Sequence, residues 1–186
     1  IYDNSDVLSA CRCWYNFIYF GHDPKLVHVL NGGLQKWKYE KKATTQNIEV
    51  FKKSNYLCNE NKNLVKNFKQ IKENIIFESF RIVDARSRER FEGKVEEPRK
   101  GLRSGSIPNS KCLPFKEIIN INNTFKSDDD IKEIFKEKID DVGATNVVFS
   151  CGSGVTACVL ALAYSLINVK YMPTIYDGSW AEYGKN

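Results

Sequence analysis

Short apolar runs alternate with longer stretches of helical periodicity in the second half of the chain. Residues 80–85 (FRIVDA) and 146–149 (NVVF) are apolar and contain β-branched side chains, which is typical of buried strands. Residues 64–75 place apolar side chains at helical spacing, and residues 154–164 are small, apolar and long enough for about three helical turns. Strands that alternate with helices predict an α/β fold, with a parallel sheet that has helices on both faces.

A repeated pattern relates the two ends of the chain. The stretches SACRCWYNFIYF (9–20) and TACVLALAYSLI (156–167) both begin with a small residue, alanine and cysteine, and both continue as an apolar run of helical length. Further along, VLNGGLQKW (29–37) and IYDGSWAEY (175–183) each place a short strand and a glycine turn before a helix that ends in an aromatic residue. This shared order indicates a duplicated α/β unit, with chance similarity as the alternative.

The two copies differ in what precedes them, and this predicts the domain organisation. The second copy has a long segment of its own ahead of the shared element, whereas Ile1-Tyr2-Asp3 already corresponds to the strand before the loop in the first copy. We therefore expect residues 1–42 to be the C-terminal part of a first domain. Residues 43–63 are rich in asparagine and lysine, which favours a linker, and residues 64–186 are then one complete domain.

A glycine-rich turn that begins with Cys151 joins the predicted strand to the apolar helix. Ligands of parallel sheets bind beyond the carboxyl ends of the strands, and Cys151 falls at such an end. Gly152 and Gly154 can adopt positive φ, so the backbone N–H groups of the turn can converge. Together with the N-terminus of a helix expected to start near Val155, these groups would stabilise a thiolate. Cys151 is therefore a candidate nucleophile.

The residues after Cys151 narrow its chemistry. Ser153 places a hydroxyl within reach of a group bound to the sulfur. Cysteine phosphatases need an arginine six residues after the nucleophile to clamp the phosphoryl oxygens, but Ala157 occupies that position. A buried structural cysteine is the alternative for Cys151, and its flexible neighbours argue against it. Cys158 lies on the apolar helix and fits that alternative better.

The composition excludes several classes of protein. The chain has 186 residues, 42% of them hydrophobic and 27% charged, which is typical of a globular protein. The apolar runs are shorter than the ~18 to 20 residues of a membrane span, so we expect no membrane partner. The net charge is +5, but without a basic stripe interleaved with aromatic residues we expect no nucleic-acid partner. The six cysteines form no CxxC pair, which predicts reduced thiols, no metal site, and an intracellular location.

Four segments together resemble the 3-mercaptopyruvate sulfurtransferases, two-domain members of the rhodanese family. CGSGVTAC (151–158) is similar to their active-site loop, and IVDARSRERFEGKVEEPRKG (82–101) to their Asp-x-Arg strand with its Arg-Phe and Glu-Pro-Arg segments. GSIPNSKCLPF (105–115) resembles their Gly-His-Ile-Pro-Gly segment, and IYDGSWAEY (175–183) their Tyr-Asp-Gly-Ser-Trp ending. The resemblance covers essentially the whole chain and implies a rhodanese-like fold, with residues 1–42 at the end of an inactive first domain.

The resemblance also implies a reaction. The thiolate of Cys151 would take the sulfane sulfur from 3-mercaptopyruvate, release pyruvate and hold the sulfur as a persulfide. Thioredoxin, another thiol or cyanide would then accept that sulfur, and no cofactor is needed. The implied catalytic residues are Cys151 and Ser153, and the implied pocket residues are Gly152, Gly154, Val155 and Thr156. The expected location is cytoplasmic or mitochondrial.

Two arginines and the loop bear on the identity of the sulfur donor. Arg90 and Arg99 match the arginines that bind the substrate carboxylate in this family, and a planar guanidinium suits that group. From the sequence alone, an arginine in such a Lys/Arg-rich segment is more often a solvated surface residue, and it is the motif match that favours a functional role for both. Thiosulfate-preferring relatives carry basic residues directly after the cysteine, where this chain has Gly152 and Ser153. This favours mercaptopyruvate, with thiosulfate as the alternative donor.

The chain also departs from the family. Its members bring a histidine and an aspartate from the early first domain to the active site, and neither segment is present here; His22 and His28 match other positions. The first copy has Asn4 where a loop cysteine would fall, so we expect no second nucleophile there. Two other functions therefore stay open, a non-catalytic binding module and a sulfur carrier loaded by a desulfurase.

Overall fold

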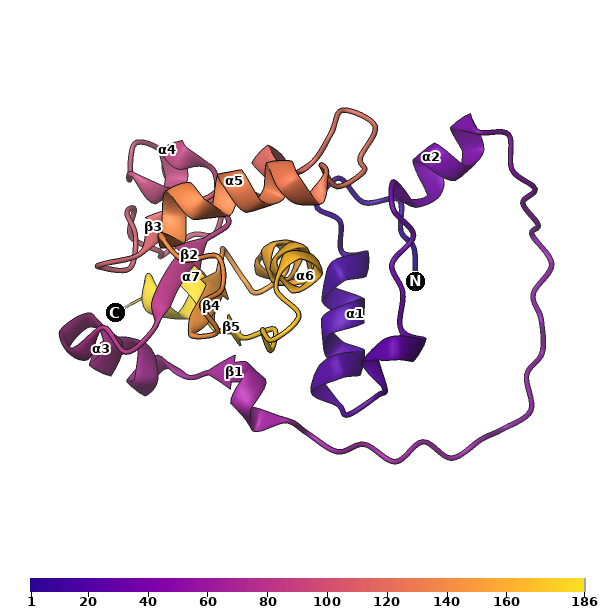
Figure 1. Cartoon of the computed structure of the whole chain (residues 1–186), viewed down its shortest axis with the longest axis horizontal. Helices are drawn as coiled ribbons and strands as arrows, with labels where there is room; N and C mark the ends of the chain where they lie inside the picture. Colours follow the sequence, from indigo (N-terminus) through magenta and orange to yellow (C-terminus); the bar gives the residue numbers. More distant parts are fainter. Residues whose placement is uncertain (186) are drawn as a thin grey trace.

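A five-stranded parallel sheet forms the centre of the computed structural model, which describes residues 1–185 (Figure 1). The strand order is β1-β5-β4-β2-β3, and every pairing in it is parallel. The predicted α/β class with a parallel sheet is confirmed. The strands are β1 Val65–Lys66, β2 Arg81–Asp84, β3 Lys111–Cys112, β4 Val147–Ser150 and β5 Ile175–Tyr176.

Helices cover both faces of this sheet, as the sequence predicts. Helices α5 and α6 lie against one face and α3 and α7 against the other, and α1 packs beside α6 (Figure 1). The helices are α1 Ala10–Tyr19, α2 Gly33–Tyr39, α3 Phe68–Phe77, α4 Arg88–Phe91, α5 Asp128–Ile139, α6 Ala157–Ile167 and α7 Ser179–Tyr183. Short 3-10 helices span Pro24–Leu26, Lys62–Leu64 and Phe115–Ile118.

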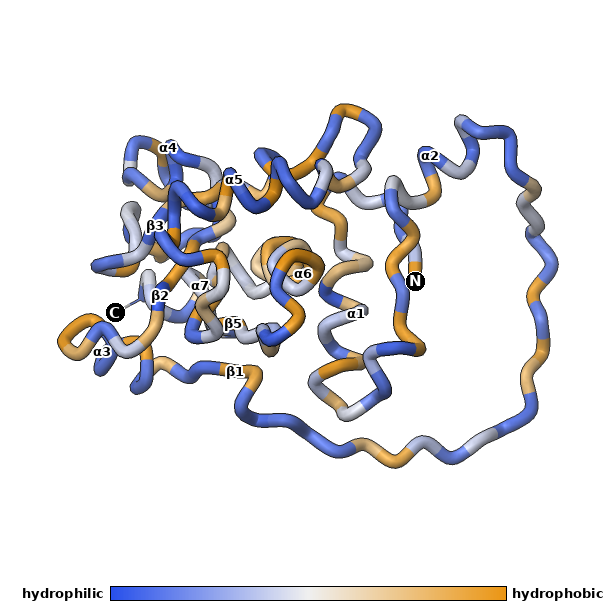
Figure 2. The backbone as a smooth tube through the Cα atoms, viewed as in Figure 1, coloured by the Kyte–Doolittle hydropathy of each residue, from blue (hydrophilic) through white to orange (hydrophobic). Residues whose placement is uncertain are grey.

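Helix α6 is apolar on every side and is therefore enclosed by other elements. All eight residues from Ala157 to Tyr164 are buried, which requires cover around the whole circumference of the helix. The sheet and α5 supply part of it, and α1 supplies another part through Cys11, Trp14 and Tyr15. The apolar colouring of α6 at the centre of the molecule is visible in Figure 2. The N-terminal segment thus shares a hydrophobic core with the second half of the chain.

The opposite face of the sheet carries a smaller core. Ile71 of α3 and Trp180 and Tyr183 of α7 pack there with Ile82 of β2 and Val148 of β4. Because side chains alternate along a strand, the neighbours of Ile82 and Val148 face the larger core instead. β4 therefore contributes to both cores and is fully buried.

Two expected element boundaries are wrong. The helix expected over 64–75 begins only at Phe68, because Asn67 and Gln70 form a capping box in which each side chain accepts a hydrogen bond from the other's backbone N–H, at 3.0 and 2.9 Å. Leu64, the first apolar residue of the helix expected over 64–75, lies in a 3-10 helix ahead of β1. Likewise, α6 begins at Ala157 rather than near Val155.

Residues 43–61 run outside the sheet and helices as an extended arc (Figure 1). Several of their apolar side chains are exposed, including Ile48, Val50 and Leu57. The arc returns to the molecule where the N–H groups of Asn59 and Asn61 donate to carbonyl groups at the end of α1. The division into residues 1–42, 43–63 and 64–186 stays a prediction.

Candidate functional site

The carboxyl end of β4 leads directly into a pocket that contains Cys151. The pocket has a volume of about 300 Å³. Seven of the eight site residues predicted from the sequence line it, namely Arg90, Arg99, Cys151, Gly152, Ser153, Val155 and Thr156. The eighth, Gly154, is buried within the same loop. Cys151 is itself only 1% exposed, and its small exposed surface belongs to the lining of this pocket.

One backbone N–H of the loop contacts this sulfur, and others in the loop are unpaired. The N–H of Ser153 donates to Cys151 Sγ at 3.4 Å. Within residues 1–185, the N–H groups of Gly152, Val155 and Thr156 donate to no protein acceptor. These three residues line the pocket, and unpaired backbone N–H groups in a turn before a helix are the kind of donor that binds an anion.

The hydroxyl of Ser179, the first residue of α7, binds two backbone N–H groups of the loop. Ser179 Oγ accepts hydrogen bonds from the N–H groups of Cys151 and Gly154, at 3.2 and 3.1 Å, and donates to the carbonyl of Tyr176 at 2.8 Å. The N-terminus of α7 also binds the loop, because the N–H of Trp180 donates to the carbonyl of Cys151. Ser179 is fully buried and has φ +51°, a backbone conformation that non-glycine residues rarely adopt.

The two loop glycines differ in backbone conformation and in what an added side chain would meet. Only Gly154 has positive φ, at +77°, so the expectation of positive φ at Gly152 is not met. Gly152 instead allows a close approach, because a Cβ there would lie 3.0 Å from Arg90 Nη2. A Cβ at Gly154 would lie 2.8 Å from Arg12 Nη1 and 3.1 Å from the Asp177 carbonyl oxygen.

The two predicted arginines reach the pocket from α4 and from the irregular segment that follows it. Arg90, at the end of α4, donates to Glu97 from Nη2 at 2.5 Å and from Nε at 3.2 Å. Arg99 is exposed, and its Nη1 donates to the carbonyl of Gly152 at 3.2 Å. Arg90 thus contacts a buried carboxylate, whereas Arg99 is a surface residue that contacts the loop. A role for either arginine in binding a substrate stays a prediction.

A buried network of charges lies behind Arg90. The side chains of Arg86, Asp84 and Glu97 are each at most 2% exposed, and Arg86 pairs with both carboxylates at 2.8 Å. Glu97 completes the network by pairing with Arg90. Two cations thus balance two anions. Arg99 forms no ion pair with any described carboxylate, so it supplies the uncompensated positive charge of the pocket.

The same network lowers the pKa of Glu97. Burial by itself raises the pKa of this carboxyl, but the hydrogen bond and charge of Arg90, with the charge of Arg86, outweigh burial. The folded protein therefore binds a proton at Glu97 less readily than the unfolded chain does. Its stabilising contribution is complete above the ordinary value of 4.5 and is lost as the pH falls through the lowered pKa.

Glu97→Gln is expected to lower the free energy of unfolding at neutral pH by about 1–3 kcal/mol, because it removes charged hydrogen bonds from a buried site. As the pH falls from 4.5 through the lowered pKa, the native carboxyl becomes protonated, so the wild type should approach the variant in stability. Chemical denaturation of both proteins at neutral and acid pH measures this difference. A gap that stays constant with pH would contradict the assignment.

Several residues at the site were not predicted from the sequence. Arg12 of α1 donates to the carbonyl of Gly154 and pairs with Asp177, and Val7 lines the pocket. Glu97 and Ser179 lie in two of the segments that resemble the family, so the resemblance could have indicated both residues. For Arg12 no local signal existed, because 142 residues separate it from Gly154.

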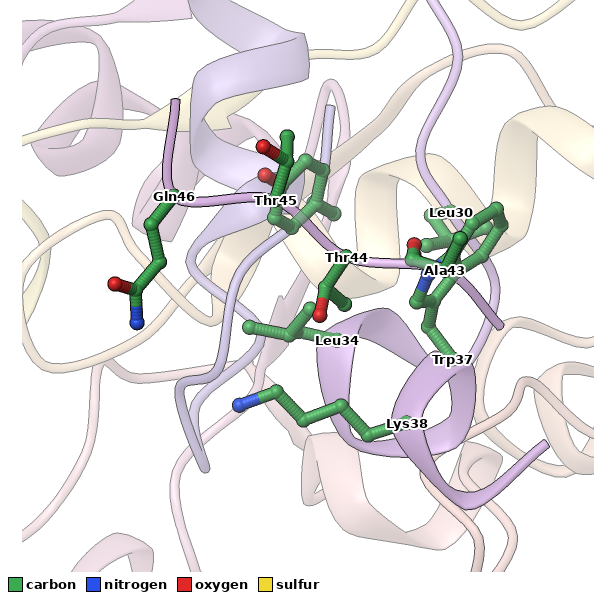
Figure 3. Close-up of a pocket in the computed structure, with 9 residues that line it drawn as sticks. Leu30, Leu34, Trp37, Lys38, Ala43, Thr44, Thr45 and Gln46 are labelled. Atoms are coloured by element: carbon green, nitrogen blue, oxygen red, sulfur yellow. Dashed lines mark hydrogen bonds between the residues drawn. The ribbon is translucent and has the colours of Figure 1, made fainter. Parts of the chain in front are cut away.

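A larger pocket, of about 420 Å³, lies elsewhere, between α2 and residues 43–46 (Figure 3). Trp37 donates from its indole N–H to the carbonyl of Ala43 there, and Leu30 and Leu34 add apolar surface. Its lining includes no cysteine. Within the described residues, no cluster of three His, Cys, Asp or Glu side chains could hold a metal ion, and no helix is both long and apolar enough to cross a membrane.

Comparison with known proteins gives consistent matches. Residues 67–186 match the family described as "Rhodanese-like domain". The chain is 36% identical to 3-mercaptopyruvate sulfurtransferase from Homo sapiens, covering 98% of this chain and 61% of that protein. It is 35% identical to thiosulfate sulfurtransferase from Rattus norvegicus, with the same two coverages.

A solved structure agrees with these sequence matches. The 3-mercaptopyruvate sulfurtransferase SseA from Escherichia coli superimposes with a TM-score of 0.80 at 28% identity, covering 96% of this chain and 65% of that one. The first curated relative, "Thiosulfate/3-mercaptopyruvate sulfurtransferase 1, mitochondrial" from Arabidopsis thaliana, is matched over 53% of its length. The chain thus spans little more than half of such relatives.

Proposed function

Because the chain belongs to the rhodanese family, we propose that it moves sulfane sulfur from a small donor to an acceptor through a persulfide on Cys151. One observation carries this proposal. Cys151 Sγ lies in a pocket with three unpaired backbone N–H groups and two guanidinium groups around it. That arrangement suits a sulfur that becomes anionic, because the donors are fixed before the charge develops.

The first half-reaction conserves atoms and charge. The thiolate of Cys151 attacks the thiol sulfur of 3-mercaptopyruvate, an S–S bond forms, and the C–S bond breaks with its electron pair on carbon. The thiol proton moves to that carbon and pyruvate leaves. Ser153 is the proposed relay for this proton, because it lines the pocket two residues after Cys151 and carries a hydroxyl. The N–H groups of Gly152, Val155 and Thr156 would bind the terminal sulfur of the persulfide.

In the second half-reaction, a thiolate or cyanide attacks that terminal sulfur. The S–S bond breaks, the sulfur leaves with the acceptor, and Cys151 returns to the thiolate. Thioredoxin or another thiol is the proposed natural acceptor, and cyanide is a convenient one in an assay. We propose a cytoplasmic or mitochondrial location, which the name of the Arabidopsis relative supports for mitochondria.

The charge balance favours a donor with one negative charge. Glu97 compensates Arg90, which leaves Arg99 as the unpaired cation at the pocket. The carboxylate of mercaptopyruvate matches one such charge, and the planar guanidinium can bind it in a bidentate way. Thiosulfate carries two charges and meets the neutral Gly152 and Ser153. Mercaptopyruvate is therefore the proposed donor, with thiosulfate as the alternative.

The proposal is tested by incubating the purified chain with each donor alone and then adding cyanide. With mercaptopyruvate we expect pyruvate release, the added mass of one sulfur atom on the peptide containing Cys151, and thiocyanate after cyanide. The same products with thiosulfate, at higher kcat/KM, would reverse the order of donors. A persulfide that forms only with a cysteine desulfurase would indicate a sulfur carrier, and no added mass with any donor would indicate a binding module.

A further inference from the structure

Arg12 connects the N-terminal helix to the catalytic loop. It lies in the first turn of α1, which is anchored because Asp3 Oδ2 accepts from Ser9 Oγ at 2.7 Å and from the N–H of Ala10 at 2.9 Å. From there its Nη1 donates to the carbonyl of Gly154 at 3.2 Å. The same nitrogen pairs with Asp177, in the turn between β5 and α7.

These contacts fix Gly154 from both sides of its backbone. The N–H of Gly154 donates to Ser179 Oγ. The carbonyl of Gly154 accepts hydrogen bonds from Arg12 Nη1 and from Cys158 Sγ, both at 3.2 Å. Gly154 has positive φ and is enclosed by the Arg12–Asp177 pair. The orientation of the following N–H groups, those of Val155 and Thr156, depends on this residue, because they continue the same backbone.

The exposed fractions of Arg12 and Asp177 indicate whether Arg12 mainly positions the loop or mainly stabilises the fold. The side chains of Arg12 and Asp177 are 28% and 46% exposed, whereas the buried network around Arg86 is almost inaccessible. Partly exposed ion pairs contribute little to folding, because solvent screens them. Loss of Arg12 should therefore change the loop geometry more than the stability of the protein.

We propose that Arg12 is a positioning residue for sulfur transfer. It holds the Gly154 carbonyl so that the loop N–H groups converge on the sulfur carried by Cys151. This inference rests on the proposed function, and it assigns a role in the active site to the N-terminal segment. Arg12 does not touch the donor, since the residues lining the pocket do not include it.

The test compares Arg12→Gln, Arg12→Lys and the wild type in the full chain. For Arg12→Gln we expect kcat for pyruvate release to fall about tenfold while KM changes less than about twofold, because Arg90 and Arg99 still bind the donor. Arg12→Lys keeps a cationic donor and should recover part of the rate. The melting temperature of both variants should stay close to that of the wild type.

A second measurement does not depend on turnover. Iodoacetamide alkylation of Cys151, followed by peptide mass spectrometry at one fixed pH, reports how reactive the sulfur is in this loop geometry. We expect slower alkylation in Arg12→Gln and an unchanged rate in Arg81→Gln, whose exposed pair with Asp140 is remote from the loop. This arm gives a result even if the wild type transfers no sulfur.

Three outcomes would overturn the role of Arg12. One is wild-type kcat and alkylation in Arg12→Gln. Another is an equal loss of activity in Arg81→Gln. The third is a fall in activity that matches a fall in the folded fraction measured by circular dichroism. A wild type without turnover but with slower alkylation in Arg12→Gln would refute the sulfurtransferase proposal and still support the positioning role.

Discussion

Replacing Cys151 with serine is expected to lower the rate of pyruvate release from mercaptopyruvate by about a thousandfold or more. A serine hydroxyl does not ionise near neutral pH and cannot form an S–S bond, so the persulfide route is lost entirely. A thousandfold loss corresponds to about 4 kcal/mol of transition-state stabilisation. Steady-state pyruvate release and the mass of the loop peptide after donor treatment measure it.

Cys13→Ser is the matched control, because Cys13 is an exposed cysteine on α1 outside the pocket. It should retain the wild-type rate. If Cys151→Ser and the wild type released pyruvate at equal rates, the loop would not be the catalytic site. Binding of the donor to Cys151→Ser, measured by calorimetry, should survive because Arg90 and Arg99 are intact.

Removing the charge of Arg86 is expected to lower the free energy of unfolding more than the substitutions at Glu97 and Arg88 do. In Arg86→Leu the carboxylates of Asp84 and Glu97 lose the cation that lies between them, and both side chains are at most 2% exposed. Leaving a buried charge without its partner costs about 3–5 kcal/mol. The indole of Trp180 also loses its contact with the guanidinium, whose central carbon lies 4.5 Å from the ring centre. Denaturant unfolding measures the loss.

Arg88→Leu provides the comparison two positions along the chain. Arg88 pairs with Glu117 at 2.6 Å, but the two side chains are 47% and 36% exposed. Solvent screens such a pair, and its loss should cost less than about 1 kcal/mol. Equal destabilisation by Arg86→Leu and Arg88→Leu would show that burial of the network does not matter.

The sequence predicts those parts of the fold whose signal is local. The runs at 80–85 and 146–149 match β2 and β4 to within one residue at each end, because most buried positions of these strands are apolar. β1 and β3 have two residues each, which is too short for any periodicity. The helix predicted from Leu64 begins only at Phe68, because the capping box of Asn67 and Gln70 sets the start of α3 and the spacing of apolar residues does not reveal it.

The candidate site divides in the same way. Cys151 and its glycine-rich turn were predicted from neighbouring residues, because a loop between strand and helix is a local feature. Arg90 and Arg99 came from the family resemblance, since nothing in the surrounding charged segment distinguishes them. Arg12 could not be predicted, because only the packing of α1 on α6 brings it to Gly154.

The enclosure of α6 limits how far the chain can be shortened. A version trimmed to residues 64–186 would keep the nucleophile and both arginines, yet it would strip away Trp14 and Tyr15 and leave one flank of α6 in water. Newly bared apolar surface of that kind promotes self-association. A variant of this chain that stays monomeric in solution therefore needs α1 as well as the segment that carries Cys151, Arg90 and Arg99.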